Sequence, residues 1–149
     1  MSLKSITAFL KSIPWQAYCR FSLGLGGLFG GMSLFLLGSF LVKEMAATVD
    51  KTGIIFYRNF LINTFLPNAD IFIPALGAIA LFAGILIFIG KWVNFGIFLM
   101  ILICFHFFAW EWPALGAYKG FVFAVLALVV LFSKKSRAYP IEEIIRQLR

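Results

Sequence analysis

Residues 71–89 have the sequence IFIPALGAIALFAGILIFI, and residues 92–110 have the sequence WVNFGIFLMILICFHFFAW. Neither stretch contains Asp, Glu, Lys or Arg. Each has close to the roughly 20 residues that an α-helix needs to cross a hydrocarbon layer of about 30 Å. Gly90 and Lys91 separate the two stretches. The sequence therefore predicts two antiparallel membrane spans joined by a tight turn.

Two other apolar stretches, residues 21–42 and 114–133, have a similar length. The first contains no charged residue, and the second contains Lys119, near enough to one end for its side chain to reach the membrane surface. Apolar residues occupy successive positions in both, whereas strands of a membrane barrel alternate apolar and polar residues. We therefore predict an all-α fold, an integral membrane four-helix bundle with spans at about 21–42, 71–89, 92–110 and 114–133.

The composition leads to the same class of protein. Hydrophobic residues make up 62% of the 149 residues, charged residues make up 13%, and the mean hydropathy is +1.00. A water-soluble core of this size has no room for so much apolar surface, so we expect a single membrane domain over residues 1–149, with lipid as solvent and partner. Cys19 and Cys104 lie near opposite ends of different apolar stretches and predict neither a disulfide nor a metal site.

The distribution of basic residues predicts the orientation, and it explains the net charge of +7 without a nucleic-acid partner. Cytoplasmic loops and tails of membrane proteins carry the excess of Lys and Arg. With four spans, both termini share one side with the turn at Gly90. Nine basic residues fall on that side: Lys4, Lys11, Arg20, Lys91, Lys134, Lys135, Arg137, Arg146 and Arg149. Four fall on the other side: Lys43, Lys51, Arg58 and Lys119. Both termini are therefore expected in the cytoplasm.

Both ends of the chain have the pattern of amphipathic helices that lie on a membrane surface. Apolar residues recur at helical spacing in residues 3–13 and again in residues 141–148, and Pro140 suits a first helical turn. We expect both tails to lie along the inner leaflet. They serve either as simple anchors or as docking segments for a partner.

Small residues recur at helical spacing in the first two spans. This spacing lets two helix backbones approach closely in a membrane, either within one chain or between two copies. The first span contains two overlapping pairs, Gly26 with Gly30 and Gly27 with Gly31, and the second span aligns Gly77, Ala80 and Gly84 on one face. We expect these glycines to form helix-packing surfaces.

The stretch between the first two spans is less polar than an ordinary loop. Apolar and aromatic residues dominate from Ile54 to Leu66, which indicates a helix that lies at the outer interface or covers the bundle. Pro67 and Asn68 are then expected to turn the chain into the second span. A long insertion of this kind can close a cavity between spans, although a lipid-facing interfacial helix fits the same pattern.

His106 is the one histidine of the chain, and it lies inside the third span. Its imidazole can hydrogen-bond to a quinone, relay a proton, bind haem iron, or pack as a structural side chain. Two histidines from this chain cannot hold a haem, because there is no second one. Helical spacing places Trp110 on the same face, and the topology brings Tyr57 and Arg58 to the same end of the bundle. We therefore predict a pocket there, formed by His106, Trp110, Tyr57 and Arg58.

Three segments resemble the DoxX-like membrane proteins, a family related to the membrane subunit of thiosulfate:quinone oxidoreductase. These segments are RFSLGLGGLFGG at residues 20–31, FYRNFLINTFLPNADIF at residues 56–72 and GAIALFAGILIFIGKW at residues 77–92. The resemblance implies a four-helix bundle in the cytoplasmic membrane of a bacterium or archaeon. It also implies other subunits as partners, a quinone as ligand and no covalently bound cofactor.

Two functions are compatible with these observations. The first is a membrane subunit of a quinone-linked oxidoreductase, as the resemblance implies. The second is a structural or assembly subunit of a larger membrane complex that binds protein and lipid and carries no chemistry of its own. A transporter is disfavoured, because the centres of the spans carry no charged residue.

Overall fold

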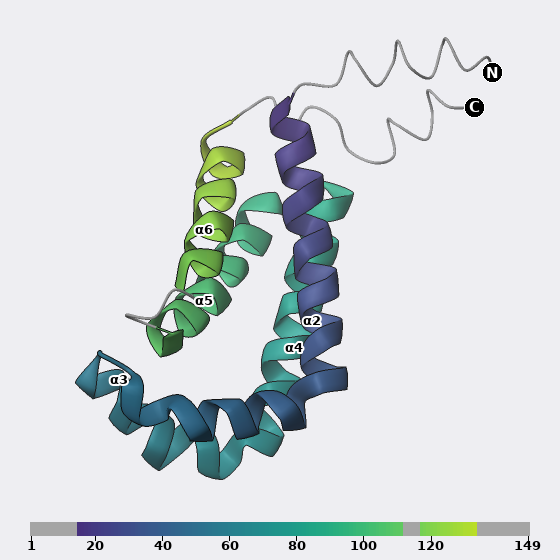
Figure 1. Cartoon of the computed structure of the whole chain (residues 1–149). Coiled ribbons are helices and arrows are strands. Elements are labelled where there is room, and N and C mark those ends of the chain that lie inside the picture. The colour runs from purple at the N-terminus through teal and green to yellow at the C-terminus, as the bar shows by residue number, and fades with distance from the viewer. Residues whose placement is uncertain (1–14, 112–116, 134–149) are drawn as a thin grey trace, which may run out of the picture.

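The structure is a computed structural model that describes residues 15–111 and 117–133. Within these ranges every regular element is helical, and Figure 1 shows four helices side by side: α2 (Trp15–Thr48), α4 (Ala69–Ile89), α5 (Val93–Glu111) and α6 (Ala117–Phe132). Three helical segments are long and apolar enough to cross a membrane, namely Ala17–Lys51, Ile55–Ile89 and Val93–Trp110, and a shorter apolar helix spans Phe121–Phe132. The prediction of an all-α membrane bundle is confirmed for the described part of the chain.

The first helix is longer than its apolar stretch. We expected a span over residues 21–42, whereas α2 runs from Trp15 to Thr48. Lys43 and Glu44 are exposed, so the charged pair ends the apolar stretch without interrupting the hydrogen bonds of the helix. Hydropathy therefore marks the part of a helix that lipid can surround and not the end of the helix itself. The two expected tail helices and the beginning of the expected fourth span lie outside the described residues.

Residues 49–68, here called the cap segment, connect α2 to α4. They form a 3₁₀ turn (Val49–Lys51), the short helix α3 (Ile55–Phe60), a π-helical turn (Leu61–Phe65) and a second 3₁₀ turn (Leu66–Asn68). Figure 1 shows the cap segment lying across the end of the bundle, together with the last turns of α2. The predicted helix over the bundle is therefore present. The expected turn at Pro67 is instead a bend, because this proline fits the first turn of a 3₁₀ helix that continues into α4.

The turn between α4 and α5 has the expected position and a clear local cause. Gly90 adopts a left-handed conformation with φ of 87°, and its backbone N–H donates to the Leu86 carbonyl at 3.1 Å. A residue without Cβ adopts this conformation without steric penalty, so glycine is the usual residue after the last turn of a helix. Trp92 also has a positive φ, 57°, and its side chain is exposed. The tight return between the two spans is confirmed.

Many of the buried apolar side chains form two clusters along the bundle. The turn-end cluster lies near Gly90 and consists of Leu23, Ile87, Val93, Ile97, Met100, Cys104, Ala127 and Val130. The cap-end cluster lies under the cap segment and consists of Leu34, Met45, Val49, Leu61, Phe65, Ala69, Ile73 and Trp110. Each cluster ties together residues that are distant in the sequence, so the cap segment is part of the packed fold.

Helices α2 and α4 approach each other through glycines. A Cβ added at Gly84 would lie 2.7 Å from the backbone nitrogen of Leu28 and 2.8 Å from the Gly24 carbonyl oxygen. A Cβ at Gly31 would lie 2.8 Å from the Gly77 carbonyl oxygen. Real Cβ atoms do not sit this close to backbone atoms, so no larger residue fits these positions at the present helix spacing. We call this contact the glycine seam, formed by Gly24, Gly27 and Gly31 of α2 with Gly77 and Gly84 of α4.

Candidate functional site

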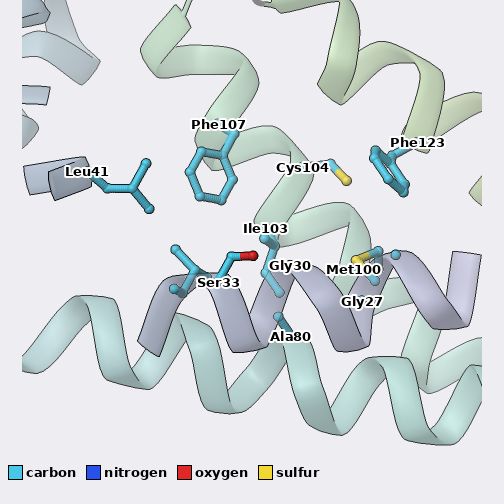
Figure 2. Close-up of a pocket in the computed structure, with 12 residues that line it drawn as sticks. Gly27, Gly30, Ser33, Leu41, Ala80, Met100, Ile103, Cys104, Phe107 and Phe123 are labelled. Atoms are coloured by element: carbon cyan, nitrogen blue, oxygen red, sulfur yellow. The ribbon is translucent and has the colours of Figure 1, made fainter. Parts of the chain in front are cut away.

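A cavity of about 280 Å³ lies between the four bundle helices (Figure 2). Its wall includes Leu34 of the cap-end cluster and Met100 and Cys104 of the turn-end cluster, so the cavity separates the two packed clusters. The residues that line it are Gly26, Gly27, Gly30, Ser33, Leu34, Leu41, Ala80, Met100, Ile103, Cys104, Phe107 and Phe123.

The cavity is elongated along the bundle. Its wall on α2 extends from Gly26 to Leu41, and at about 1.5 Å per residue this distance is roughly 22 Å along the helix. On α5 the lining residues run from Met100 to Phe107 at the spacing of one helix face. Figure 2 places Phe107 beside Leu41 at one end of the view and Cys104 beside Phe123 at the other. The lining residues therefore extend farther along α2 than along α5.

The missing side chain of Gly30 leaves part of this space open. A Cβ built at Gly30 meets no heavy atom within 4 Å, so this glycine borders open space. A Cβ at Gly26 would lie 2.5 Å from the Phe123 ring, so that ring already occupies the space above Gly26. We predicted both glycines as helix-packing positions, and the structure places Gly27 and Gly31, but neither Gly26 nor Gly30, at the glycine seam.

The wall of the cavity is apolar. Among its described residues only Ser33 and Cys104 carry a polar side-chain atom. The Ser33 hydroxyl donates to the Phe29 carbonyl of its own helix at 2.8 Å, and a thiol is a weak hydrogen-bonding group. A polar ligand would therefore leave its own groups unpaired here, whereas a hydrocarbon would not.

Tyr57 and His106 meet at the cap end, 49 positions apart in the sequence. The Tyr57 hydroxyl forms a hydrogen bond with Nδ1 of His106, and it lies 3.1 Å from the His106 carbonyl oxygen. Aromatic rings surround the imidazole, with centroid distances of 4.7 Å to Phe65, 5.5 Å to Phe107 and 5.7 Å to Tyr57. The Nε2 atom is buried and has no hydrogen-bond partner in the described part of the chain.

The hydrogen count at this pair favours one tautomer of His106. If the Tyr57 hydroxyl donates to Nδ1, the ring proton is on Nε2, and a buried N–H is left without an acceptor. If Nδ1 carries the proton, it donates to the Tyr57 oxygen, and the hydroxyl donates to the His106 carbonyl. The second arrangement uses both hydrogens, and a buried donor without a partner is rarer than an unused acceptor. Nε2 is then a hydrogen-bond acceptor.

Trp110 lies one turn beyond His106 and holds the cap segment in place. Its indole N–H donates to the Thr48 hydroxyl at 3.2 Å, and its backbone carbonyl accepts from the Thr52 hydroxyl at 3.2 Å. The Trp110 side chain is buried in the cap-end cluster. Since its polar hydrogen already has an acceptor, the residue serves packing in this conformation.

The predicted pocket residues thus have different positions. Tyr57 and His106 are in contact, and Trp110 is near them on α5. Arg58 is half-buried on α3, and successive residues of a helix differ by about 100° in direction, so it does not share the face of Tyr57. None of the four lines the cavity, whereas Phe107, whose ring contacts His106, does.

The sequence did not indicate Phe123, which lines the cavity from α6. Every side of an apolar helix looks alike in a sequence of this composition, so no pattern distinguishes a cavity wall from a lipid-facing side. An isolated glycine without a small residue on the facing helix is the signal that could have indicated open space at Gly30. The partner helix must be known before that signal can be used.

No group of three or more His, Cys, Asp or Glu residues that could hold a metal ion occurs in residues 15–111 and 117–133. Comparisons of the chain with models of protein families, with curated proteins and with solved structures found no match.

Proposed function

We propose that this chain is a DoxX-like membrane subunit that binds a quinone and works with other subunits of a quinone-linked oxidoreductase. The observation that carries the proposal is the buried Nε2 atom of His106, which has no hydrogen-bond partner within the described residues. His106 does not line the apolar cavity, but the next residue on α5, Phe107, does. Ligand sites of this kind combine a largely apolar wall with few polar groups that fix the orientation of the ligand. Phe107 borders both parts of the site.

The hydrogen bonds of His106 and Tyr57 suit both redox forms of such a ligand. With the proton on Nδ1, the Nε2 atom accepts a hydrogen bond from the hydroxyl of a quinol. With the proton on Nε2, the imidazole donates to a quinone carbonyl, and the Tyr57 hydroxyl turns to Nδ1. The pair therefore offers either an acceptor or a donor without a change of backbone. Electrons would be exchanged with the partner subunits.

The segments at residues 20–31, 56–72 and 77–92 that resemble the DoxX-like family contain parts of this arrangement. They include the glycines of the seam on α2 and α4, and they include Tyr57 and Phe65 of the cap segment. The resemblance thus supports both the helix packing and the aromatic surroundings of His106. It is the source of the proposed partners and of the quinone as the ligand class.

The binding proposal is tested with His106→Phe in the purified full-length chain. This change keeps a ring of similar size and removes both nitrogen atoms. Loss of one net hydrogen bond is expected to weaken quinone binding by about 3- to 10-fold. Phe105→Leu is the matched control, because Phe105 is adjacent and 62% exposed. Unchanged quinone affinity in a folded His106→Phe protein would contradict the proposal and favour the structural or assembly role.

The same proposal includes an orientation in the cytoplasmic membrane of a bacterium or archaeon, with both termini in the cytoplasm. Figure 1 supports a shared side, because α2 begins and α6 ends at the end of the bundle opposite the cap segment. In a cysteine-free background, Lys51→Cys should react with an impermeant maleimide in intact cells. A cysteine tag at either terminus should react only after permeabilisation. Labelling of the termini in intact cells would reverse the orientation.

A further inference from the structure

We infer that the cavity binds one acyl chain of a membrane phospholipid whose headgroup carries an ammonium group. The chain enters from the bilayer surface at the cap end, and the headgroup stays at that surface beside Glu44. This lipid site is separate from the residues predicted to bind a quinone, because none of those four residues lines the cavity. Its occupant follows from the wall, the opening and the charges of the cavity itself.

The cavity opens on a surface of α2 that lipid surrounds. Its lining residues Gly30 and Ser33 are exposed, and both lie within the apolar stretch of residues 21–42. The opening therefore faces hydrocarbon and not water. Lipid chains are the solvent at this depth, and an empty space would deprive its walls of dispersion contacts. An acyl chain that enters from the side provides these contacts.

The wall of the cavity suits a hydrocarbon chain and no polar group. The Ser33 hydroxyl already donates to the Phe29 carbonyl, and the Cys104 thiol is a weak hydrogen-bonding group. A polar ligand would lose its hydrogen bonds on entering such a space. The volume of about 280 Å³ exceeds the ~150 Å³ of an apolar cavity that accommodates benzene, so a larger hydrocarbon group fits.

The cavity comes closest to the bilayer surface at the cap end. Leu41 lines it and lies two residues before Lys43, the first charged residue after the apolar stretch. At the other end, Gly26 lies six residues after Arg20, and the Phe123 ring already occupies the space beside it. Figure 2 shows Leu41 and Phe123 at opposite ends of the cavity. A chain therefore enters near Leu41 and ends near Phe123.

Glu44 provides the charge that selects the headgroup. It lies three residues after Leu41, and helical spacing places both on the side of α2 that lines the cavity. Glu44 is exposed, so its carboxylate can accept hydrogen bonds from a primary ammonium group. The adjacent Lys43, also exposed, complements the phosphate of the same lipid. The two charges match the zwitterionic headgroup of phosphatidylethanolamine.

The test uses the full-length wild-type chain in nanodiscs that contain a phosphatidylethanolamine with a photoreactive diazirine near the end of one acyl chain. Met100 and Cys104, here called the cavity pair, line the cavity and are only 4% and 9% exposed. Leu102 and Phe105, the surface pair, lie on the same helix and are 52% and 62% exposed. After illumination, mass spectrometry of peptides should find the lipid on both pairs. Cross-links at the surface pair alone would overturn the inference.

A variant with a filled cavity provides the second measurement. Gly30→Leu places a side chain in the open space, so cross-linking of the cavity pair should fall about fivefold or more, while that of the surface pair stays unchanged. Leu36→Phe is the matched control at an exposed position of α2 and should change neither. Undiminished cross-linking of the cavity pair in folded Gly30→Leu would overturn the inference. The wild-type measurement stands even if this variant does not fold.

Two comparisons identify the lipid. A phosphatidylglycerol with the same photoreactive chain, at equal mole fraction, should label the cavity pair about threefold less, the size expected for one exposed charge pair. Glu44→Gln should abolish this difference. Equal labelling by both lipids in the wild-type protein would overturn the assignment of the headgroup. An excess of a quinone with an isoprenoid tail should leave the labelling unchanged, and loss of labelling would assign the cavity to the quinone and overturn the phospholipid site.

Discussion

Glycines of α2 border a close helix contact at some positions and open space at others. Toward α4, Gly27 and Gly31 meet backbone atoms of the facing helix, and no space remains for a methyl group. Toward α5 and α6, Gly30 lies only three positions from Gly27 and borders a cavity. A glycine in a membrane helix therefore leaves space beside the backbone, because it has no side chain. Whether a backbone or a ligand occupies the space depends on the facing helix.

The difference also indicates what each side does. Between helices in lipid there is no hydrophobic driving force, so close van der Waals contact must hold α2 and α4 together. The open side gives up such contacts, and hydrogen bonds at the cap end join α5 to the cap segment and α2 instead. The closed side is thus a structural element, and the open side is available for a ligand.

The largest expected effect follows from closing the glycine seam. Gly84→Leu places a branched side chain against the backbone of Leu28 and Gly24, so the helices must separate. The unfolding free energy in detergent should fall by about 3 kcal/mol or more, at or above the usual range for overpacking. Ala78→Leu is the matched control on α4, because Ala78 is exposed, and its stability should stay near that of the wild type. Equal stability of the two variants would mean that the seam is not a tight contact.

A smaller effect is expected at the hydrogen bonds between the cap segment and α5. Tyr57→Phe removes the hydroxyl that bonds to His106 and should lower the unfolding free energy by about 1–3 kcal/mol through unpaired buried groups. In a double-mutant cycle with His106→Phe, the second change should cost less than it does alone. Strictly additive losses would show that the two side chains do not stabilise each other.

The smallest effect of this series is expected at Trp110. Trp110→Phe keeps most of the apolar contact and removes the indole donor to Thr48, so the unfolding free energy should fall by about 0.5–1.5 kcal/mol. Trp92→Phe is the control, since Trp92 is 77% exposed at the opposite end of the bundle, and it should leave stability unchanged. If Trp92→Phe and Trp110→Phe lowered the unfolding free energy equally, the assignment of Trp110 to the cap-end packing would be wrong.

The spans around residues 71–110 were predictable because charge-free stretches of the right length flank a glycine that permits a left-handed turn. The ends of α2 and the helical continuation through Pro67 were not, because exposed charges do not end a helix and a proline can stand in its first turn. The local sequence is sufficient to predict apolar spans and turns. The local sequence is not sufficient to predict how far a helix continues beyond its apolar stretch.

The contact of Tyr57 with His106 was predictable in outline, because topology alone brings both residues to one end of the bundle. The separate direction of Arg58 follows from the helical structure of α3, which the sequence did not resolve residue by residue. The cavity could not be predicted, because Gly27 and Gly30 both stand among apolar residues and other glycines in the sequence. Only the structure shows that a Cβ at Gly27 would meet the backbone of Gly84, whereas a Cβ at Gly30 would meet no heavy atom within 4 Å.

The stability of Gly27→Ala and Gly30→Ala, measured side by side in the same detergent, tests the difference between the two sides of α2 most directly. Both changes add one methyl group to the same helix, so any difference arises from what that methyl group meets. A Cβ at Gly27 would lie 2.8 Å from Cα of Gly84, so Gly27→Ala should lower the melting temperature. Gly30→Ala should leave it unchanged or raise it, because nothing lies within 4 Å and alanine favours a helix by up to about 1 kcal/mol. Equal losses for the two variants, or a larger loss for Gly30→Ala, would contradict the account.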